Sequence, residues 1–249
     1  MFAPTSGLEL RLGCREGVGA EERTVAHQIT LYGPRRTPYT EKVRRALVLK
    51  GLDFELREPS APEDYKRWSP ETGLLPVLAI DSELVSDSTG ILLRLDELFP
   101  KPPLLASDPV IAAQQRQLED WADESFLWYW NRWLVLAQQR QAAAPVKARR
   151  GPLRVPGVRR ALAWLRAGGT WERPETGLMR GIEDRLGDLV NLLGSRRFFY
   201  ADQPSMADLA VYGMLFVLRM DAMTGSARLL ASRPMLLEFM RRLEEATGG

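Results

Sequence analysis

The sequence predicts a small α/β domain followed by an all-helical domain. Before Pro100, short apolar runs alternate with helix-forming segments, which is the pattern of an α/β protein. After Asp108, apolar residues recur at helical spacing and no segment alternates as a strand would. Between these halves, residues 100–103 contain three prolines, and such a stretch is typical of a linker between domains.

The first half contains local signals for each of its elements. Thr37 is an N-cap residue followed by Pro38, so a helix is predicted to begin there. Asp81 and Ser82 separate two apolar runs, which indicates a β-hairpin. We expect, in order, a strand at 28–32, a helix at 37–51, a strand at 53–57, an irregular helix at 61–69, a hairpin at 74–86 and a helix at 88–98.

The second half is predicted to contain helices at 108–141, 175–193, 205–220 and 234–245. In the first of these, aromatic residues that include Trp128 and Trp133 cover more than one face, so we expect this helix to be central and buried on two sides. Ser205 and Asp208 form a capping box ahead of an apolar run, and we assign both to folding. The arginine-rich segment 144–170 is consistent with a solvated surface or with a contact to an anionic membrane or partner.

Composition excludes several kinds of chemistry. The chain has 249 residues, 27% of them charged, and a net charge of +2, which gives no argument for nucleic acid binding. With one cysteine, Cys14, and one histidine, His27, it forms no intramolecular disulfide and no zinc site rich in these residues. No window approaches the ~18 apolar residues of a membrane span. Residues 1–27 are predicted to be a disordered extension without a clear signal sequence, and a cytoplasmic location is expected.

Four segments together resemble a known family. They are Thr37 to Arg44 (TPYTEKVR), Leu75 to Leu78 (LPVL), the pair Asp87-Ser88, and residues 202–208 (DQPSMAD). In this order and spacing they resemble the cytosolic glutathione transferases from about residue 28 to residue 245. The resemblance implies a thioredoxin-like domain with a four-stranded mixed sheet at 28–100, a linker at 101–107 and a helical bundle at 108–246.

The resemblance also implies a function. A glutathione transferase binds glutathione and activates its thiol for attack on an electrophilic small molecule, a reaction used in detoxification. Glutathione is then a co-substrate, no other cofactor or metal is expected, and the second substrate is an apolar electrophile. The resemblance is compatible with a homodimer. The alternative is a non-catalytic protein that uses the same fold as a binding or scaffolding module.

The catalytic residue implied by the resemblance is Thr37. A hydroxyl at a helix N-terminus can donate a hydrogen bond to a thiolate, and the helix dipole adds positive potential there. The same threonine has a plain role as the helix N-cap. Tyr32 and Tyr39 are alternative hydroxyl donors.

The implied glutathione-binding residues are Leu75, Pro76, Asp87 and Ser88. A cis bond before Pro76 would present the backbone of Leu75 to an extended peptide. Asp87 would pair with the γ-glutamyl amine, and Ser88 with the helix N-terminus would hold its carboxylate. The alternative is that Asp87 and Ser88 only cap a helix. The neighbouring arginines 35 and 36 either belong to a solvated loop or attract carboxylates.

Overall fold

The computed structural model describes residues 27–143 and 174–248. The predicted extension, apart from His27, and the arginine-rich segment 144–170 lie outside these ranges. The elements are β1 (Ile29–Tyr32), α1 (Pro38–Leu49), β2 (Glu55–Arg57), α2 (Pro62–Trp68), β3 (Val77–Ile80), β4 (Glu83–Ser86), α3 (Ser88–Leu98), α4 (Pro109–Ala143), α6 (Pro174–Leu193), α7 (Met206–Arg219), α8 (Ser226–Ala231) and α9 (Pro234–Ala246).

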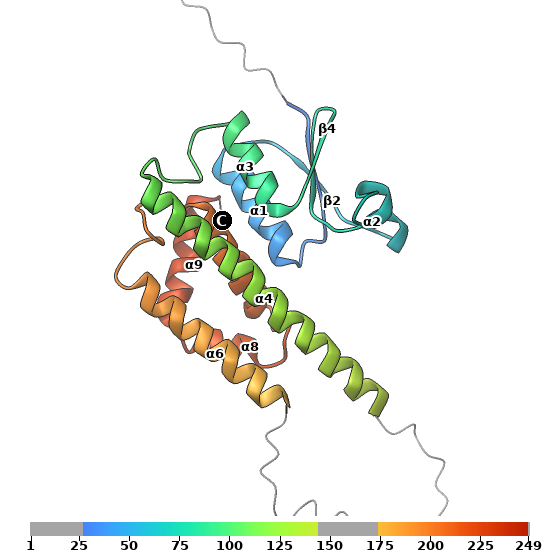
Figure 1. Cartoon of the computed structure of the whole chain (residues 1–249), viewed down its shortest axis with the longest axis vertical. Coiled ribbons are helices and arrows are strands. Elements are labelled where there is room, and N and C mark those ends of the chain that lie inside the picture. The colour runs from blue at the N-terminus through green and yellow to red at the C-terminus, as the bar shows by residue number, and fades with distance from the viewer. Residues whose placement is uncertain (1–26, 144–173, 249) are drawn as a thin grey trace, which may run out of the picture.

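The sheet has the strand order β2-β1-β3-β4. Strand β1 pairs in parallel with β2 and antiparallel with β3, and β3 and β4 form the predicted hairpin. The sheet is therefore mixed and four-stranded, as expected. Figure 1 shows α1 and α3 between the sheet and the helical part of the chain, with α2 on the opposite side of the sheet.

Helix α1 packs directly on α7. Nearly every residue of α7 is buried, which agrees with its almost entirely apolar sequence. A Cβ atom placed on Gly213 would lie 2.4 Å from the carbonyl oxygen of Pro38, so the backbones approach too closely for any side chain. The first turn of α1 therefore has a fixed position on the helical domain.

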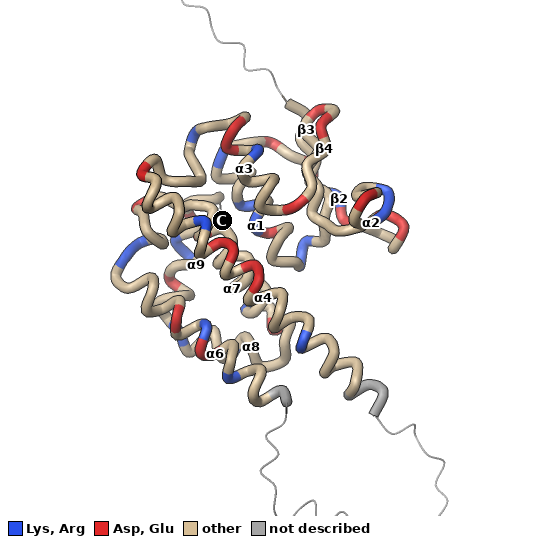
Figure 2. The backbone as a smooth tube through the Cα atoms, viewed as in Figure 1, with Lys and Arg blue, Asp and Glu red and all other residues tan. Residues whose placement is uncertain are grey.

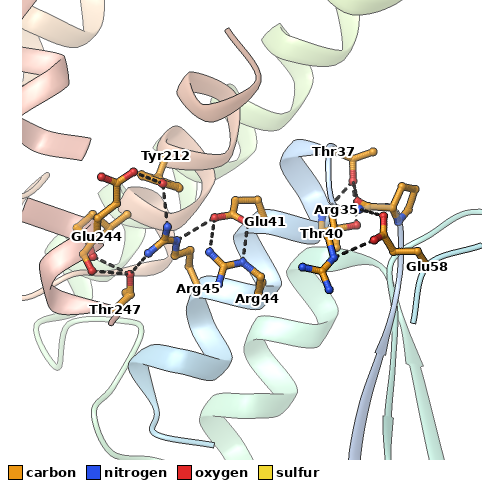
Figure 3. Close-up of polar contacts among 12 residues, drawn as sticks. Arg35, Thr37, Thr40, Glu41, Arg44, Arg45, Glu58, Tyr212, Glu244 and Thr247 are labelled. Carbon is orange, nitrogen blue, oxygen red and sulfur yellow. Dashed lines mark hydrogen bonds and ion pairs between the residues drawn. The ribbon is translucent and has the colours of Figure 1, made fainter. Parts of the chain in front are cut away.

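A buried polar network extends this contact to the C-terminal helix (Figure 3). The guanidinium of Arg45 donates to Glu41 Oε1 at 2.9 Å, to Thr247 Oγ1 at 2.7 Å and to the Tyr212 hydroxyl at 3.0 Å. Tyr212 in turn donates to Glu244 at 2.6 Å. Arg45 and Glu41 are both buried, so the network ties α1 to α7 and α9 in an environment shielded from water.

The prediction that the long helix is buried on two sides is wrong for its second half. Leu118, Ala122 and Phe126 are buried, but Trp128 is 60% exposed and Val135 is 44% exposed. Figure 1 shows the C-terminal end of α4 extending past the other described elements, and several apolar side chains of this half are exposed although Leu136 remains buried. Helix α8 was not predicted from the sequence, because six residues are too few for a helical period to be recognised.

None of the helices within the described ranges combines the length and hydropathy needed to cross a membrane.

Candidate functional site

A pocket of about 420 Å³ lies where the hairpin β3-β4 and the start of α3 face α4. Its walls are mainly apolar, with several carboxylates among them. The lining residues are Tyr39, Thr72, Leu74, Leu75, Pro76, Ser86, Asp87, Ser88, Asp123, Glu124 and Leu127. The structure therefore brings together four of the five predicted site residues, from the loop before β3 and from the N-terminus of α3.

The loop before β3 supplies Leu75 and Pro76. The peptide bond between them is cis, as the sequence resemblance implied. Pro76 is buried and Leu75 is half-buried at the pocket wall. Gly33 allows the loop after β1 to lie close by, since a Cβ there would be 2.5 Å from Thr40 Oγ1 and 3.4 Å from Pro76 Cβ.

The N-terminus of α3 supplies Asp87 and Ser88. Asp87 has a left-handed backbone (φ 68°), and its carboxylate accepts a hydrogen bond from the Gly90 N–H at 2.9 Å. The capping role is therefore present, and both residues also line the pocket. The first N–H groups of a helix lack intrahelical acceptors, so this end of α3 can bind a carboxylate. The arrangement combines an acid, a hydroxyl and a helix N-terminus in one corner.

Thr37 is the N-cap of α1, as predicted. Its hydroxyl oxygen accepts from the Thr40 N–H at 3.3 Å, and it lies 2.8 Å from Thr40 Oγ1 and 3.2 Å from the Pro34 carbonyl oxygen (Figure 3). Thr37 is not among the described residues that line the pocket. The Thr37 hydroxyl therefore donates its single proton to Pro34 or Thr40, and the hydroxyl group must rotate before it can donate to a ligand.

The alternative hydroxyl donors differ in position. Tyr39 lines the pocket, and its hydroxyl donates to the backbone oxygen of Asp123 at 3.3 Å. Burial, reinforced by the Asp123 charge, raises the pKa of Tyr39 well above its usual value, so the phenol stays protonated. The Tyr32 ring packs against Trp68 with 4.8 Å between ring centres and does not line this pocket.

The two arginines after β1 lie at the surface. Arg35 Nε is 2.8 Å from Glu58 Oε1 in an exposed ion pair, drawn in Figure 3, and Arg36 is exposed as well. Neither lines the pocket. Both arginines therefore belong to a solvated loop, which is one of the two alternatives given above.

Sequence reasoning missed a buried lysine behind the pocket. Lys42 on α1 is only 1% exposed, and its ammonium contacts two other elements, α3 and α4. It contacts Glu119 and Asp123 on α4, the latter at 2.8 Å, and donates to Ser88 Oγ at 3.4 Å and Thr89 Oγ1 at 3.2 Å. One cation thereby positions the start of α3 against α4.

A sequence signal for this lysine does exist. Lys42 lies four residues before Ala46, on the apolar face of its helix, where a charged residue needs a partner. Glu119 and Asp123 have the same four-residue spacing, so they lie on one face of their helix. Burial raises the pKa values of Glu119 and Asp123, and the Lys42 charge opposes this rise.

Comparison with known proteins identifies the N-terminal domain. Residues 31–103 match the family model of the glutathione S-transferase N-terminal domain. Glutathione S-transferase Z2 of Arabidopsis thaliana is 37% identical over 87 residues, which are 32% of this chain and 39% of that protein. Maleylacetoacetate isomerase of Pseudomonas aeruginosa is 36% identical over 99 residues, or 34% of this chain and 44% of that one. The chain thus spans about two fifths of the length of these relatives.

Solved structures match over most of the chain. A glutathione S-transferase from Methylobacterium radiotolerans, in complex with glutathione sulfonate, is 28% identical with a TM-score of 0.60, covering 87% of this chain and 90% of that one. A tau class glutathione S-transferase from mango, Mangifera indica, has a TM-score of 0.63 at 21% identity and covers 87% and 88%. The second likeness concerns the fold alone.

The mixed sheet, the cis-proline loop at the pocket and the attached helical part define a two-domain protein with a thioredoxin-like N-terminal domain. Residues 31–103 match the glutathione S-transferase N-terminal domain, and the described chain shares the two-domain fold of solved glutathione S-transferases.

Proposed function

We propose that this protein binds glutathione in the pocket beside α3 and activates its thiol for attack on an apolar electrophile. The observation that carries the proposal is the convergence of Leu75, Pro76, Asp87 and Ser88 on one pocket. Each group suits one part of a γ-glutamyl peptide. The backbone of Leu75 suits the cysteinyl unit, the Asp87 carboxylate suits the ammonium, and Ser88 with the N-terminus of α3 suits the γ-glutamyl carboxylate. The relative from Methylobacterium radiotolerans, solved with glutathione sulfonate, supports this assignment.

In the proposed complex, Asp87 accepts from the γ-glutamyl ammonium, while Ser88 and the N-terminus of α3 hold the adjacent carboxylate. The backbone of Leu75 pairs with the cysteinyl unit, which directs the sulfur toward the start of α1. The Thr37 hydroxyl and the α1 dipole stabilise the thiolate there. The thiolate forms a bond to the electrophilic carbon, whose leaving group departs with its electron pair.

The electrophile occupies the apolar remainder of the pocket. Leu74 is 71% exposed and Leu127 is 45% exposed, and these two side chains face the same pocket from opposite domains. Binding an apolar group would bury these two side chains, and each Å² of apolar surface removed from water would contribute ~25 cal/mol to the free energy of binding. We place the reaction in the cytoplasm, in agreement with a single cysteine, and expect the active form to be a homodimer.

Glutathione binding is tested with Ser88→Ala. We expect wild type to bind glutathione with millimolar or better affinity and the variant to bind about tenfold more weakly or worse, because a hydrogen bond to a charged group contributes ~1.5–3 kcal/mol. Isothermal titration calorimetry measures both. Ser82→Ala, in the exposed hairpin turn, is the matched control and should bind as wild type does. If wild type does not bind glutathione, or if wild type and Ser88→Ala bind it equally well, the assignment of Ser88 to the glutathione site is wrong.

Thiol activation is tested by changing Thr37 in two ways. Thr37→Ser keeps the hydroxyl and should be at least as active as wild type, whereas Thr37→Val keeps the shape and should lose ~10-fold or more in kcat/KM. The pKa of bound glutathione thiol should rise in parallel, which absorbance of the thiolate reports.

The Thr37 pair also decides between catalysis and binding alone. A second candidate, a glutathione-binding module without activation, is favoured by the hydrogen bonds that direct the Thr37 hydroxyl to Pro34 and Thr40. Binding of glutathione by all three proteins, without turnover of any electrophile, would support that candidate. Equal activity in both variants would show that Thr37 is only a cap.

A further inference from the structure

We propose that the electrophile-binding part of the pocket selects neutral or cationic electrophiles and rejects anionic ones. This inference rests on the proposed glutathione-dependent function and concerns the class of second substrate. It follows from the charges on the pocket wall and from the absence of an available cation among the described residues that line it.

The charged side chains that line the pocket are all carboxylates: Asp87, Asp123 and Glu124. In the proposed complex the glutathione ammonium neutralises Asp87, which leaves Asp123 and Glu124. These two lie on α4, on the same side of the pocket as Leu127 and across from Leu74. An apolar group held between the two leucines therefore lies beside α4 carboxylates.

The charge of α4 extends beyond the pocket wall. Glu119 and Asp120 precede Asp123 and Glu124 by one helical turn, and Figure 2 shows acidic segments in red on α4. This stretch thus contributes four carboxylates within six residues. The bound thiolate adds one further negative charge next to the reacting carbon.

Two cations that contact or neighbour α4 do not offset this charge for a ligand. The ammonium of Lys42 lies behind the wall, 1% exposed, and is already shared by Glu119 and Asp123. Arg185 lines a neighbouring hollow on α4, together with Glu124, and its guanidinium is 2.8 Å from Asp188. A carboxylate on the electrophile would therefore meet two carboxylates and a thiolate, with no cation among the described residues that line the pocket.

The expected size of the effect follows from Coulomb's law in a partly hydrated site. Two unit charges about 7 Å from the substrate charge change the rate constant by about sevenfold at the dielectric constant of water and low ionic strength, and by more at the lower dielectric of a protein surface. Since Glu124 is exposed, part of the preference should disappear in concentrated salt.

The test compares three electrophiles with the same reacting ring. We suggest 4-chloro-3,5-dinitrobenzamide, the anionic 4-chloro-3,5-dinitrobenzoate and a cationic trimethylammonioethyl amide, each corrected for its uncatalysed reaction with glutathione. We expect kcat/KM for the anion to be at least threefold below that of the neutral probe, and the cation to equal or exceed it. Equal or faster turnover of the anion would overturn the proposal.

A matched pair of variants locates the effect. Glu124→Gln should reduce the ratio of cation to anion by about half or more, because it removes one carboxylate without disturbing Lys42. Asp184→Asn removes an exposed carboxylate on α6 that does not line the pocket and should keep the wild-type ratio. An unchanged ratio in Glu124→Gln would exclude this residue as the determinant.

Failure of charge selection can be distinguished from failure of the proposed glutathione-dependent function. The three S-aryl glutathione conjugates can be titrated directly by calorimetry, so charge selection is measured even without turnover. If all conjugates bind alike, the selection is excluded while glutathione binding stands. If none binds, the glutathione site itself is excluded, and the inference falls with it.

Discussion

Lys42→Met is expected to lower the free energy of unfolding by about 3–5 kcal/mol, because it leaves a buried carboxylate without its cation. Glu119 is 1% exposed and depends on Lys42 for charge compensation, with Thr89 as its other donor. The substitution also removes the hydrogen bonds and ion pairs by which the Lys42 ammonium connects α1 with α3 and α4. Urea denaturation followed by circular dichroism measures the change, and an unaltered m-value would show that the folded state is otherwise intact.

Two further variants make this result specific. Lys42→Met combined with Glu119→Gln should recover part of the lost stability, since the amide needs no counter-charge. Lys66→Met, at an exposed position on α2, should change stability by no more than ~0.5 kcal/mol. A Lys42→Met protein within ~1 kcal/mol of wild type would contradict the buried ion pair.

Asp208→Ala is expected to destabilise the protein by about 2–4 kcal/mol. The Asp208 carboxylate is fully buried and accepts hydrogen bonds from the Ser205 N–H at 2.8 Å, from Ser205 Oγ at 2.6 Å and from the Phe199 N–H at 2.8 Å. Alanine leaves two buried backbone donors without an acceptor, at ~1–3 kcal/mol each. Thermal unfolding measures the loss, and glutathione affinity at a temperature where both proteins are folded should be unchanged.

The same carboxylate predicts a pH dependence. Burial raises the pKa of Asp208 to about 7, although three hydrogen bonds oppose the rise. Between the unfolded value of ~3.9 and about 7, the folded state holds a proton that the unfolded state releases, so stability falls as pH rises through this window. The difference in unfolding free energy between wild type and Asp208→Asn should shrink from pH 4 to pH 7. A difference that is flat across this range would contradict the raised pKa.

Much of the fold was predictable because its signals are local. The capping box at Ser205, the proline after Thr37 and the turn at Asp81 each act over a few residues, and the structure confirms all three. The exposure of the second half of α4 was not predictable in this way. Its aromatic residues have the composition of a core, and only the position of the other helices decides which of them are covered.

The residues of the candidate site likewise fall into those that local sequence predicts and those that depend on long-range contacts. Asp87 and Ser88 are adjacent in sequence and so could be proposed from their place before a helix, and the pocket contains both. Lys42 and Glu119 are 77 residues apart, and no local pattern shows that one neutralises the other. The hydrogen bonds of the Thr37 hydroxyl likewise depend on the folded loop, where Thr40 and Pro34 compete for its proton.

The close approach of Gly213 to Pro38 limits how the two halves of this protein can be recombined. The carbonyl oxygen of Pro38 in the N-terminal half leaves room for only a hydrogen atom on the Cα of Gly213 in α7. Any graft of the N-terminal half onto a related helical half must therefore retain glycine at this position. A methyl group there would displace the helix that begins at Pro38, and with it the loop of Thr37. Diversification of the helical half is therefore freer in α4, which lines the pocket and extends past the other described helices, than in α7, on which α1 packs.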